Sequence, residues 1–170
     1  MNSSQLGTAL LMKQYKELSR NPPDGIFVGL IDDSDLYKWR VILQGPSATI
    51  WEGGYFPTTL IFPKDFPNKP PVMHFTMKDF WHPNVYPDGK VCISILHEYK
   101  EDQMNTQEKL SEKWRPILSV EAVLVSVLSM LDAPNINSPA NIDASVQYKD
   151  HYKEYKRRIR RLVRQSQEAL

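Results

Sequence analysis

The chain has 170 residues, which is enough for one compact domain with a sizeable core and too few for two ordinary ones. We therefore expect residues 1–170 to form a single domain. A hydrophobic share of 41% and a charged share of 24% are typical of a globular protein and exclude a largely disordered one. The formal net charge of +1 does not favour nucleic-acid binding by the chain as a whole.

The sequence contains no candidate membrane span and no secretory signal. Its longest apolar run, residues 122–131, is too short to cross a bilayer, and the N-terminus lacks the charged start and apolar stretch of a signal peptide. The single cysteine, Cys92, excludes an intramolecular disulfide. These features favour a reducing compartment, the cytosol or the nucleus, without direct membrane insertion.

The first half of the chain predicts one helix and then four strands. Apolar positions at helical spacing predict a helix over residues 4–20, and Pro22 stops it. Turn-bounded segments then predict short strands over residues 25–31, 36–43, 56–62 and 72–76. Because the turns between them are too short for helical crossovers, the strands should form an antiparallel meander.

The second half predicts three more helices. Ser119 is a candidate N-cap for a helix that reaches Leu131 and ends before Pro134. This helix is apolar on both faces, so we expect it to be deeply buried. Residues 142–148 and 151–169 predict the last two helices. A helix, four strands and then helices, segregated along the chain, predict an α+β fold.

Residues 97–113 break this compact pattern, because they are rich in charged residues and poor in apolar ones. A loop of seventeen residues without regular structure is uncommon in a compact domain and is usually functional or disordered. The loop begins five residues after Cys92, which favours a functional role.

Cys92 lies in a segment that Pro83, Pro87 and Asp88-Gly89 predict to be rigid and rich in turns. Cysteine is a strong nucleophile at neutral pH because a small fraction of it is already thiolate. Composition alone equally allows a small buried apolar residue.

Three kinds of cysteine chemistry can be compared. A hydrolase needs a histidine base, and His74, His82, His97 and His151 are candidates, yet no protease-like signature surrounds Cys92 and we expect no paired base. A metal site is disfavoured because one cysteine and scattered histidines lack paired ligand spacing. Acyl carriage by thioester exchange needs only an oxyanion donor and a desolvated amine.

A set of motifs spread over nearly the whole chain is more informative than any one of them. His82-Pro83-Asn84 precedes Cys92 by eight residues, and Trp114-x-Pro116 precedes the long apolar helix. The other motifs are Gly45-Pro46, Trp51-Glu52-Gly53-Gly54, Phe62-Pro63-Lys64-Asp65-Phe66-Pro67 and Lys69-Pro70-Pro71. Together they resemble the ubiquitin-conjugating enzymes. The charged loop and Ser138-Pro139-Ala140-Asn141 resemble a sub-group with an acidic loop insertion, of the endoplasmic-reticulum-associated-degradation type.

The resemblance implies that Cys92 accepts ubiquitin from an activating enzyme as a thioester and passes it to a lysine with a ring-type ligase. No cofactor or metal is implied. Asn84 would either donate to the tetrahedral oxyanion or hold nearby backbone, and a turn residue bonding its own backbone is the alternative. His82 would be structural rather than a base. The sub-group implies lysine-linked ubiquitin chains that signal proteasomal degradation.

The acceptor lysine must lose a proton, since its unperturbed pKa is near 10.4. Many family members have an aspartate just before the proline that follows the long helix, where this chain has Ser138. We hypothesise that the loop supplies the missing function through His97, Glu101 and Asp102. The alternative is a solvated loop without a catalytic part.

The resemblance also implies a surface for the activating enzyme and ligases. The matching positions are Lys13, Lys16, Pro67, Asn68 and Trp114-Arg115-Pro116-Ile117. Asn68 stands where the family commonly has an apolar anchor, so docking of a generic ring-type ligase should be weaker or more selective. The two lysines equally fit an ordinary solvated helix face.

Residues 153–164 are strongly basic, which is compatible with binding to nucleic acid or an acidic membrane. Ile159, Leu162 and Val163 instead favour an amphipathic helix docked through one side, with its charges solvated. A catalytically weak ubiquitin-binding scaffold and a carrier of another ubiquitin-like modifier remain as alternative functions. Recruitment to the endoplasmic reticulum surface would require a partner.

Overall fold

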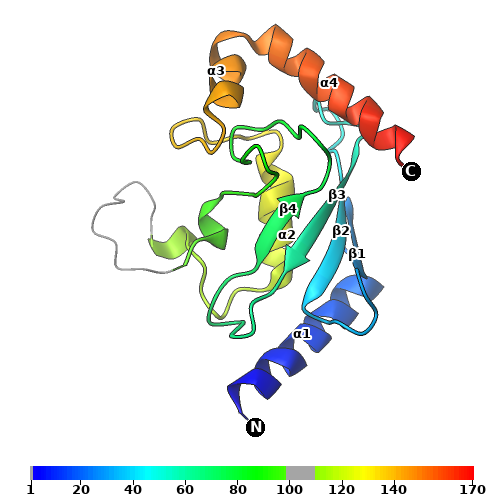
Figure 1. Cartoon of the computed structure of the whole chain (residues 1–170), viewed down its shortest axis with the longest axis vertical. Coiled ribbons are helices and arrows are strands. Elements are labelled where there is room, and N and C mark those ends of the chain that lie inside the picture. The colour runs from blue at the N-terminus through cyan, green and yellow to red at the C-terminus, as the bar shows by residue number, and fades with distance from the viewer. Residues whose placement is uncertain (1, 99–109) are drawn as a thin grey trace.

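The computed structural model describes residues 2–98 and 110–170. In chain order its main elements are α1 (Ser3–Arg20), β1 (Ile26–Leu30), β2 (Lys38–Gln44), β3 (Tyr55–Ile61), β4 (Val72–Phe75), α2 (Val120–Met130), α3 (Ile142–Asp150) and α4 (Tyr152–Glu168). Two short 3₁₀ turns, η1 (Ser94–Leu96) and η2 (Leu110–Glu112), precede α2. The predicted α+β fold is confirmed, with element boundaries shifted by about two residues at most (Figure 1).

The four strands form one antiparallel sheet in the order β1-β2-β3-β4, as the short turns predicted. One row of paired residues crosses the sheet from Val41 through Thr58 to Phe75, and all three are buried. The hydroxyl of Thr58 donates to the carbonyl oxygen of Val41 at 2.7 Å, so the polar atom in this row is satisfied. Figure 1 shows α2 lying across a face of this sheet.

The N-terminal helix α1 is fixed to the rest of the protein at two places. A side chain at Gly7 would collide with the backbone carbonyl of Phe66, so the helix and the loop after β3 approach closely here. Farther along, the side-chain oxygen of Gln14 accepts a hydrogen bond from the backbone N–H of Val120 at 2.6 Å. This bond satisfies a donor at the start of α2 and holds α1 beside it.

The long helix α2 differs from the expectation. Ser119 caps it, accepting from the backbone N–H of Ala122 at 3.1 Å, and Val123, Leu124 and Val127 are fully buried. Val125, however, is 42% exposed. Burial of both faces is therefore wrong, because one side of α2 packs on the sheet while the other faces solvent.

The C-terminal helix α4 docks through one side, as its apolar pattern predicted. Tyr155, Ile159, Leu162 and Val163 are buried. The hydroxyl of Ser166 accepts from the backbone N–H of Tyr55 at 3.0 Å, which fixes the end of α4 to β3. No helix among residues 2–98 and 110–170 is long and apolar enough to cross a membrane.

Candidate functional site around Cys92

Cys92 lies on an extended segment just beyond the edge of the sheet. Its backbone N–H donates to the carbonyl oxygen of Asn84 at 2.8 Å, and an isolated bridge pairs Val85 with Val91. Gly89 makes the preceding turn with φ +96°, and a side chain there would collide with the carbonyl of Phe75. The prediction of a turn-rich segment is confirmed.

A groove of about 1150 Å³ opens beside the Cys92 sulfur. One wall is the Cys92 segment, and the other combines the exposed side of α2 with the chain that follows it. Val125 and Ser129 come from α2, and Ser138 comes from the following loop. The thiol is partly exposed, so the alternative of a fully buried cysteine does not hold.

The side chains of His97 and Tyr86 lie beside the sulfur of Cys92. The Nε2 atom of His97 lies 3.4 Å from it, because η1 turns the chain back toward Cys92. A hydrogen bond to Cys92 is the largest cause that raises the pKa of Tyr86, followed by the charge of the thiolate. The expectation that no base is paired with Cys92 is therefore wrong, since His97 is within contact distance.

Asn84 is 3% exposed, and both ends of its side-chain amide are occupied. The amide nitrogen donates to the carbonyl oxygen of Asn135 at 2.8 Å, and the amide oxygen accepts from the backbone N–H of Asn135 at 2.8 Å. The carbonyl of Pro83 next to it accepts from the N–H groups of Ala140 and Asn141. In this arrangement Asn84 holds the loop that carries Ser138 beside Cys92.

His82 is fully buried beneath this turn. Its Nδ1 accepts from the backbone N–H of Asn84 at 2.9 Å, so the ring proton is on Nε2, which donates to the carbonyl oxygen of Met130 at 2.6 Å. Burial lowers the pKa of His82 to about 4. The imidazole is neutral near pH 7 with both nitrogens occupied, which is the arrangement of a structural histidine.

The loop after Cys92 is closed at its base. The backbone N–H of Trp114 donates to the carbonyl oxygen of His97 at 3.0 Å, which brings the two ends of the loop together. Its last part forms η2, so the absence of regular structure predicted for residues 97–113 is wrong at that end. Glu101 and Asp102 lie outside the described residues.

The surface predicted to receive partners is formed by α1 and two loops. Lys13, Lys16, Asn68 and Pro116 are exposed, and Pro67 is partly exposed. Trp114 is 1% exposed, and its indole N–H donates to the carbonyl oxygen of Pro67 at 2.8 Å. A direct contact of Trp114 with a partner is therefore wrong, because this side chain joins the two loops from below. Ile117 is the most exposed large apolar side chain there, at 86%, and Met12 of α1 is 43% exposed.

Sequence reasoning missed three participants in the site. Tyr86 falls within the motif around His82, but nothing in the sequence indicated its contact with the thiol. Asn135 contributes backbone groups across a separation of 51 residues, for which the sequence carries no signal. Val125 falls in the helix that was expected to be buried on both faces, and its exposure beside Cys92 was therefore not foreseen. Among the described residues, no group of three or more His, Cys, Asp or Glu side chains is arranged to hold a metal ion.

Comparisons with known proteins identify the family to which the chain belongs. The family model described as ubiquitin-conjugating enzyme matches residues 10–163. The chain is 49% identical over 167 residues to ubiquitin-conjugating enzyme E2 15 of Schizosaccharomyces pombe (98% of this chain, 99% of the relative). It is 46% identical to ubiquitin-conjugating enzyme E2 G2 of Homo sapiens (94% and 97%). The solved structure of human ubiquitin-conjugating enzyme E2 G1 matches with a TM-score of 0.65 and 48% identity (75% and 96%). The chain belongs to the ubiquitin-conjugating enzyme family.

Proposed function

We propose that Cys92 carries ubiquitin as a thioester and transfers it, with a ring-type ligase, to lysines of growing ubiquitin chains that signal proteasomal degradation. The partly exposed Cys92 thiol at the open groove is the observation that supports this most directly. The motifs shared with the acidic-loop sub-group support the chain type. The single-cysteine composition supports action in the cytosol or nucleus, with recruitment to the endoplasmic reticulum through a partner.

Loading exchanges one thioester for another. The sulfur of Cys92 attacks the ubiquitin carbonyl held by the activating enzyme, the new C–S bond forms, and the activating enzyme's thiolate leaves. His97, 3.4 Å from the sulfur, is placed to hold the thiol proton. In the second step a lysine amine attacks the same carbonyl, an isopeptide bond forms, and the Cys92 thiolate leaves. Tyr86 and His97 are the donors that stabilise this thiolate.

The amine must be desolvated and oriented before it reacts. Ser138 lies in the groove that holds Cys92 and His97, so it offers a hydrogen bond but no charge. We assign the missing negative charge to Glu101 and Asp102 of the adjoining loop, whose base His97 and Trp114 close. Lys13, Lys16, Asn68, Pro116 and the exposed Ile117 form the surface for the activating enzyme and the ligase.

A gel run without reductant tests the carrier function. After incubation with activating enzyme, ATP and ubiquitin, we expect a band larger by one ubiquitin that disappears on addition of thiol. The Cys92→Ser variant should give the same shift as an oxyester that resists thiol. If the intact chain forms no thiol-sensitive band, the carrier proposal fails and a non-catalytic ubiquitin-binding scaffold becomes the better explanation.

Replacing Ser138 by aspartate should accelerate discharge of ubiquitin to free lysine, because a carboxylate beside the thioester attracts the ammonium ion and orients it. We expect an increase of about two- to tenfold at neutral pH, which is about 0.4–1.4 kcal/mol of barrier and lies in the range of a partly screened ion pair. The measurement is single-turnover discharge of preloaded protein. The Ser138→Asn variant, which adds no charge, is the control, and an equal increase with asparagine would contradict the electrostatic explanation.

Neutralising the loop should have the opposite effect. The double variant Glu101→Gln/Asp102→Asn is expected to slow lysine discharge while leaving thioester formation on Cys92 unchanged. Unchanged discharge would mean that the loop is a solvated segment without a catalytic part. The paired change Glu52→Gln/Asp33→Asn removes two exposed charges from loops that do not contact the site and serves as the matched control.

A further inference from the structure

The outer side of α4 carries an uninterrupted stripe of cationic side chains, which we call the α4 stripe. It consists of six residues: Lys153, Lys156, Arg157, Arg160, Arg161 and Arg164. They are spaced alternately three and one residues apart, so they share one side of the helix over roughly 16 Å of its length. These same six side chains line a surface hollow of about 420 Å³.

The α4 stripe is not neutralised within the described part of the protein. The two ion pairs among residues 2–98 and 110–170 join Lys38 to Asp35 and Lys69 to Asp65, and neither involves α4. Glu154 beside the stripe and Glu168 beyond its end form no ion pair with it. Like charges one helical turn apart repel each other, so the stripe disfavours folding unless an external anion offsets it.

The charge of the protein is divided unevenly between α4 and the rest. With seven cationic and two acidic side chains, α4 has a net charge of +5. The whole chain has a formal charge of +1, so the remainder has a net charge of −4. Such a distribution directs one end of the molecule toward a negatively charged surface.

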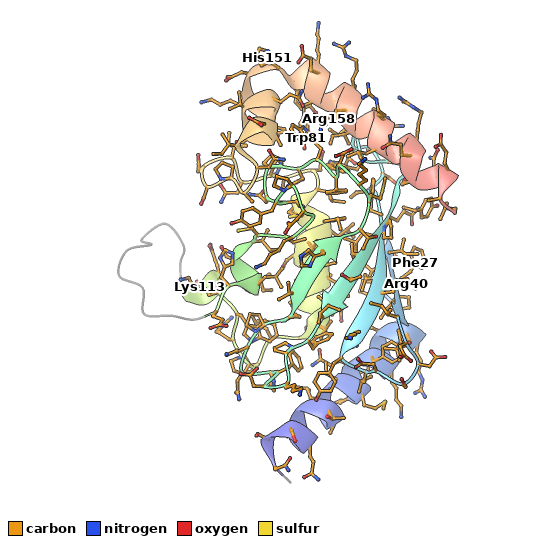
Figure 2. The ribbon with its side chains drawn as sticks, in the orientation of Figure 1. Phe27, Arg40, Trp81, Lys113, His151 and Arg158 are labelled. Carbon is orange, nitrogen blue, oxygen red and sulfur yellow. The ribbon has the colours of Figure 1, made fainter. Side chains whose placement is uncertain are left out.

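The opposite side of α4 limits what it can bind. Tyr155, Ile159 and Val163 are buried against the domain, so the helix has no apolar side available to insert into a bilayer. The stripe contains no aromatic side chain on which single-stranded bases would stack. A flat anionic surface needs only one accessible side of a helix that lies parallel to it. In Figure 2, side chains that end in nitrogen atoms project outward from α4. Arg158 differs, because its guanidinium carbon lies over the Trp81 ring, 3.4 Å from the ring centroid.

We propose that the α4 stripe adsorbs the protein onto membranes rich in anionic phospholipids, by charge attraction and without insertion. Clusters of this size on an amphipathic helix are typical of such binding. Figure 1 shows α1 and α4 at opposite ends of the molecule. The surface of α1 therefore stays accessible while α4 lies on a membrane, so an adsorbed molecule can still be loaded with ubiquitin.

Vesicle flotation of the full-length protein tests this proposal. We expect it to float with vesicles of two parts phosphatidylcholine to one part phosphatidylserine at least about tenfold better than with phosphatidylcholine alone. Raising the salt to about 0.5 M should abolish the difference. Equal partitioning to both kinds of vesicle, or binding that resists salt, would overturn the proposal.

Three variants define the surface. The stripe variant replaces four of the six residues and keeps Lys153 and Arg160. Arg160 donates to the carbonyl oxygens of Ile50 and Glu52 and so has a structural role. The stripe variant is Lys156→Gln/Arg157→Gln/Arg161→Gln/Arg164→Gln. The control removes four exposed charges elsewhere, Arg20→Gln/Arg40→Gln/Lys90→Gln/Lys149→Gln. The third variant keeps the charge, Arg157→Lys/Arg161→Lys/Arg164→Lys. We expect the first to lose at least about tenfold in vesicle binding, and the other two to lose less than about threefold.

The result remains interpretable if a variant folds poorly. Removing like-charge repulsion should leave the melting temperature of the stripe variant equal to or above that of the parent, and thioester loading of Cys92 should be unchanged. If the control variant loses as much vesicle binding as the stripe variant, net charge and not the stripe is responsible, and the proposal fails. It fails equally if the protein binds a single-stranded oligonucleotide but no vesicle, in which case α4 is a nucleic-acid surface.

Discussion

Replacing Asn84 by alanine should slow transfer of ubiquitin from preloaded Cys92 to lysine by about 10²–10³-fold. Loss of one oxyanion donor has an effect of this size, and so does a displacement of about 1 Å at the reacting atoms. The structure favours the second cause, because both ends of the Asn84 amide are bonded to the backbone of Asn135. The measurement is single-turnover discharge to free lysine, which separates this step from loading.

Stability measurements distinguish these two roles of Asn84. If Asn84 holds the loop, the same variant should lose about 1 kcal/mol of unfolding free energy, since two hydrogen bonds disappear and water replaces them only in part. The control is Asn135→Ala, which keeps the backbone groups that Asn84 contacts and should change discharge by less than about threefold. Slow discharge with unaltered stability would contradict the positioning role and favour a direct oxyanion donor.

Acidification should destabilise this protein through His82. The pKa of His82 is about 4 in the folded state, because the ring is buried, against about 6.5 in the unfolded chain. Between these two values the unfolded chain binds a proton that the folded protein does not, so the unfolding free energy falls as the pH decreases. Over the full interval the loss amounts to about 3 kcal/mol, and above pH 6.5 the contribution of His82 no longer changes.

Urea unfolding of wild-type protein and His82→Gln between pH 7.5 and pH 4 measures this contribution. The amide nitrogen of glutamine can still donate to Met130, so the variant should fold with lower stability at neutral pH and show a flatter dependence on pH. The control is His151→Gln, at the exposed junction of α3 and α4 in Figure 2, which should retain the wild-type slope. Parallel slopes for wild type and His82→Gln would contradict the assignment.

The sequence predicted the fold well because local signals and long-range constraints agree in this chain. Prolines and short turns limit the strands to a meander, and the pairing of β1 through β4 follows that order. Ser119 predicted the start of α2 through a bond to a residue three positions away, which depends only on local geometry. The turn around Gly89 is similarly local, since its positive φ favours glycine in any fold.

The site was predicted less completely because its contacts depend on tertiary packing. Periodicity cannot show that Val125 borders a groove, since an apolar side chain beside an active site has the same pattern as one in the core. Nor can it show that Trp114 is buried under Pro67, because a conspicuous aromatic residue in a loop serves equally well as an anchor or a support. The role of Asn135 rests on its main chain, which residue identity does not reveal.

The hydrogen bond between Trp114 and His97 has a consequence for how this family can diversify. Because the chain between them leaves and returns at neighbouring points, its length can change without altering the geometry of the strands or of α2. Each doubling of such a segment costs only about 0.6 kcal/mol in closure entropy. Insertions at this position therefore lower the stability of the fold only slightly, and they begin close to the thioester on Cys92. A conjugating enzyme can thus vary its chemistry at this boundary while its fold stays the same.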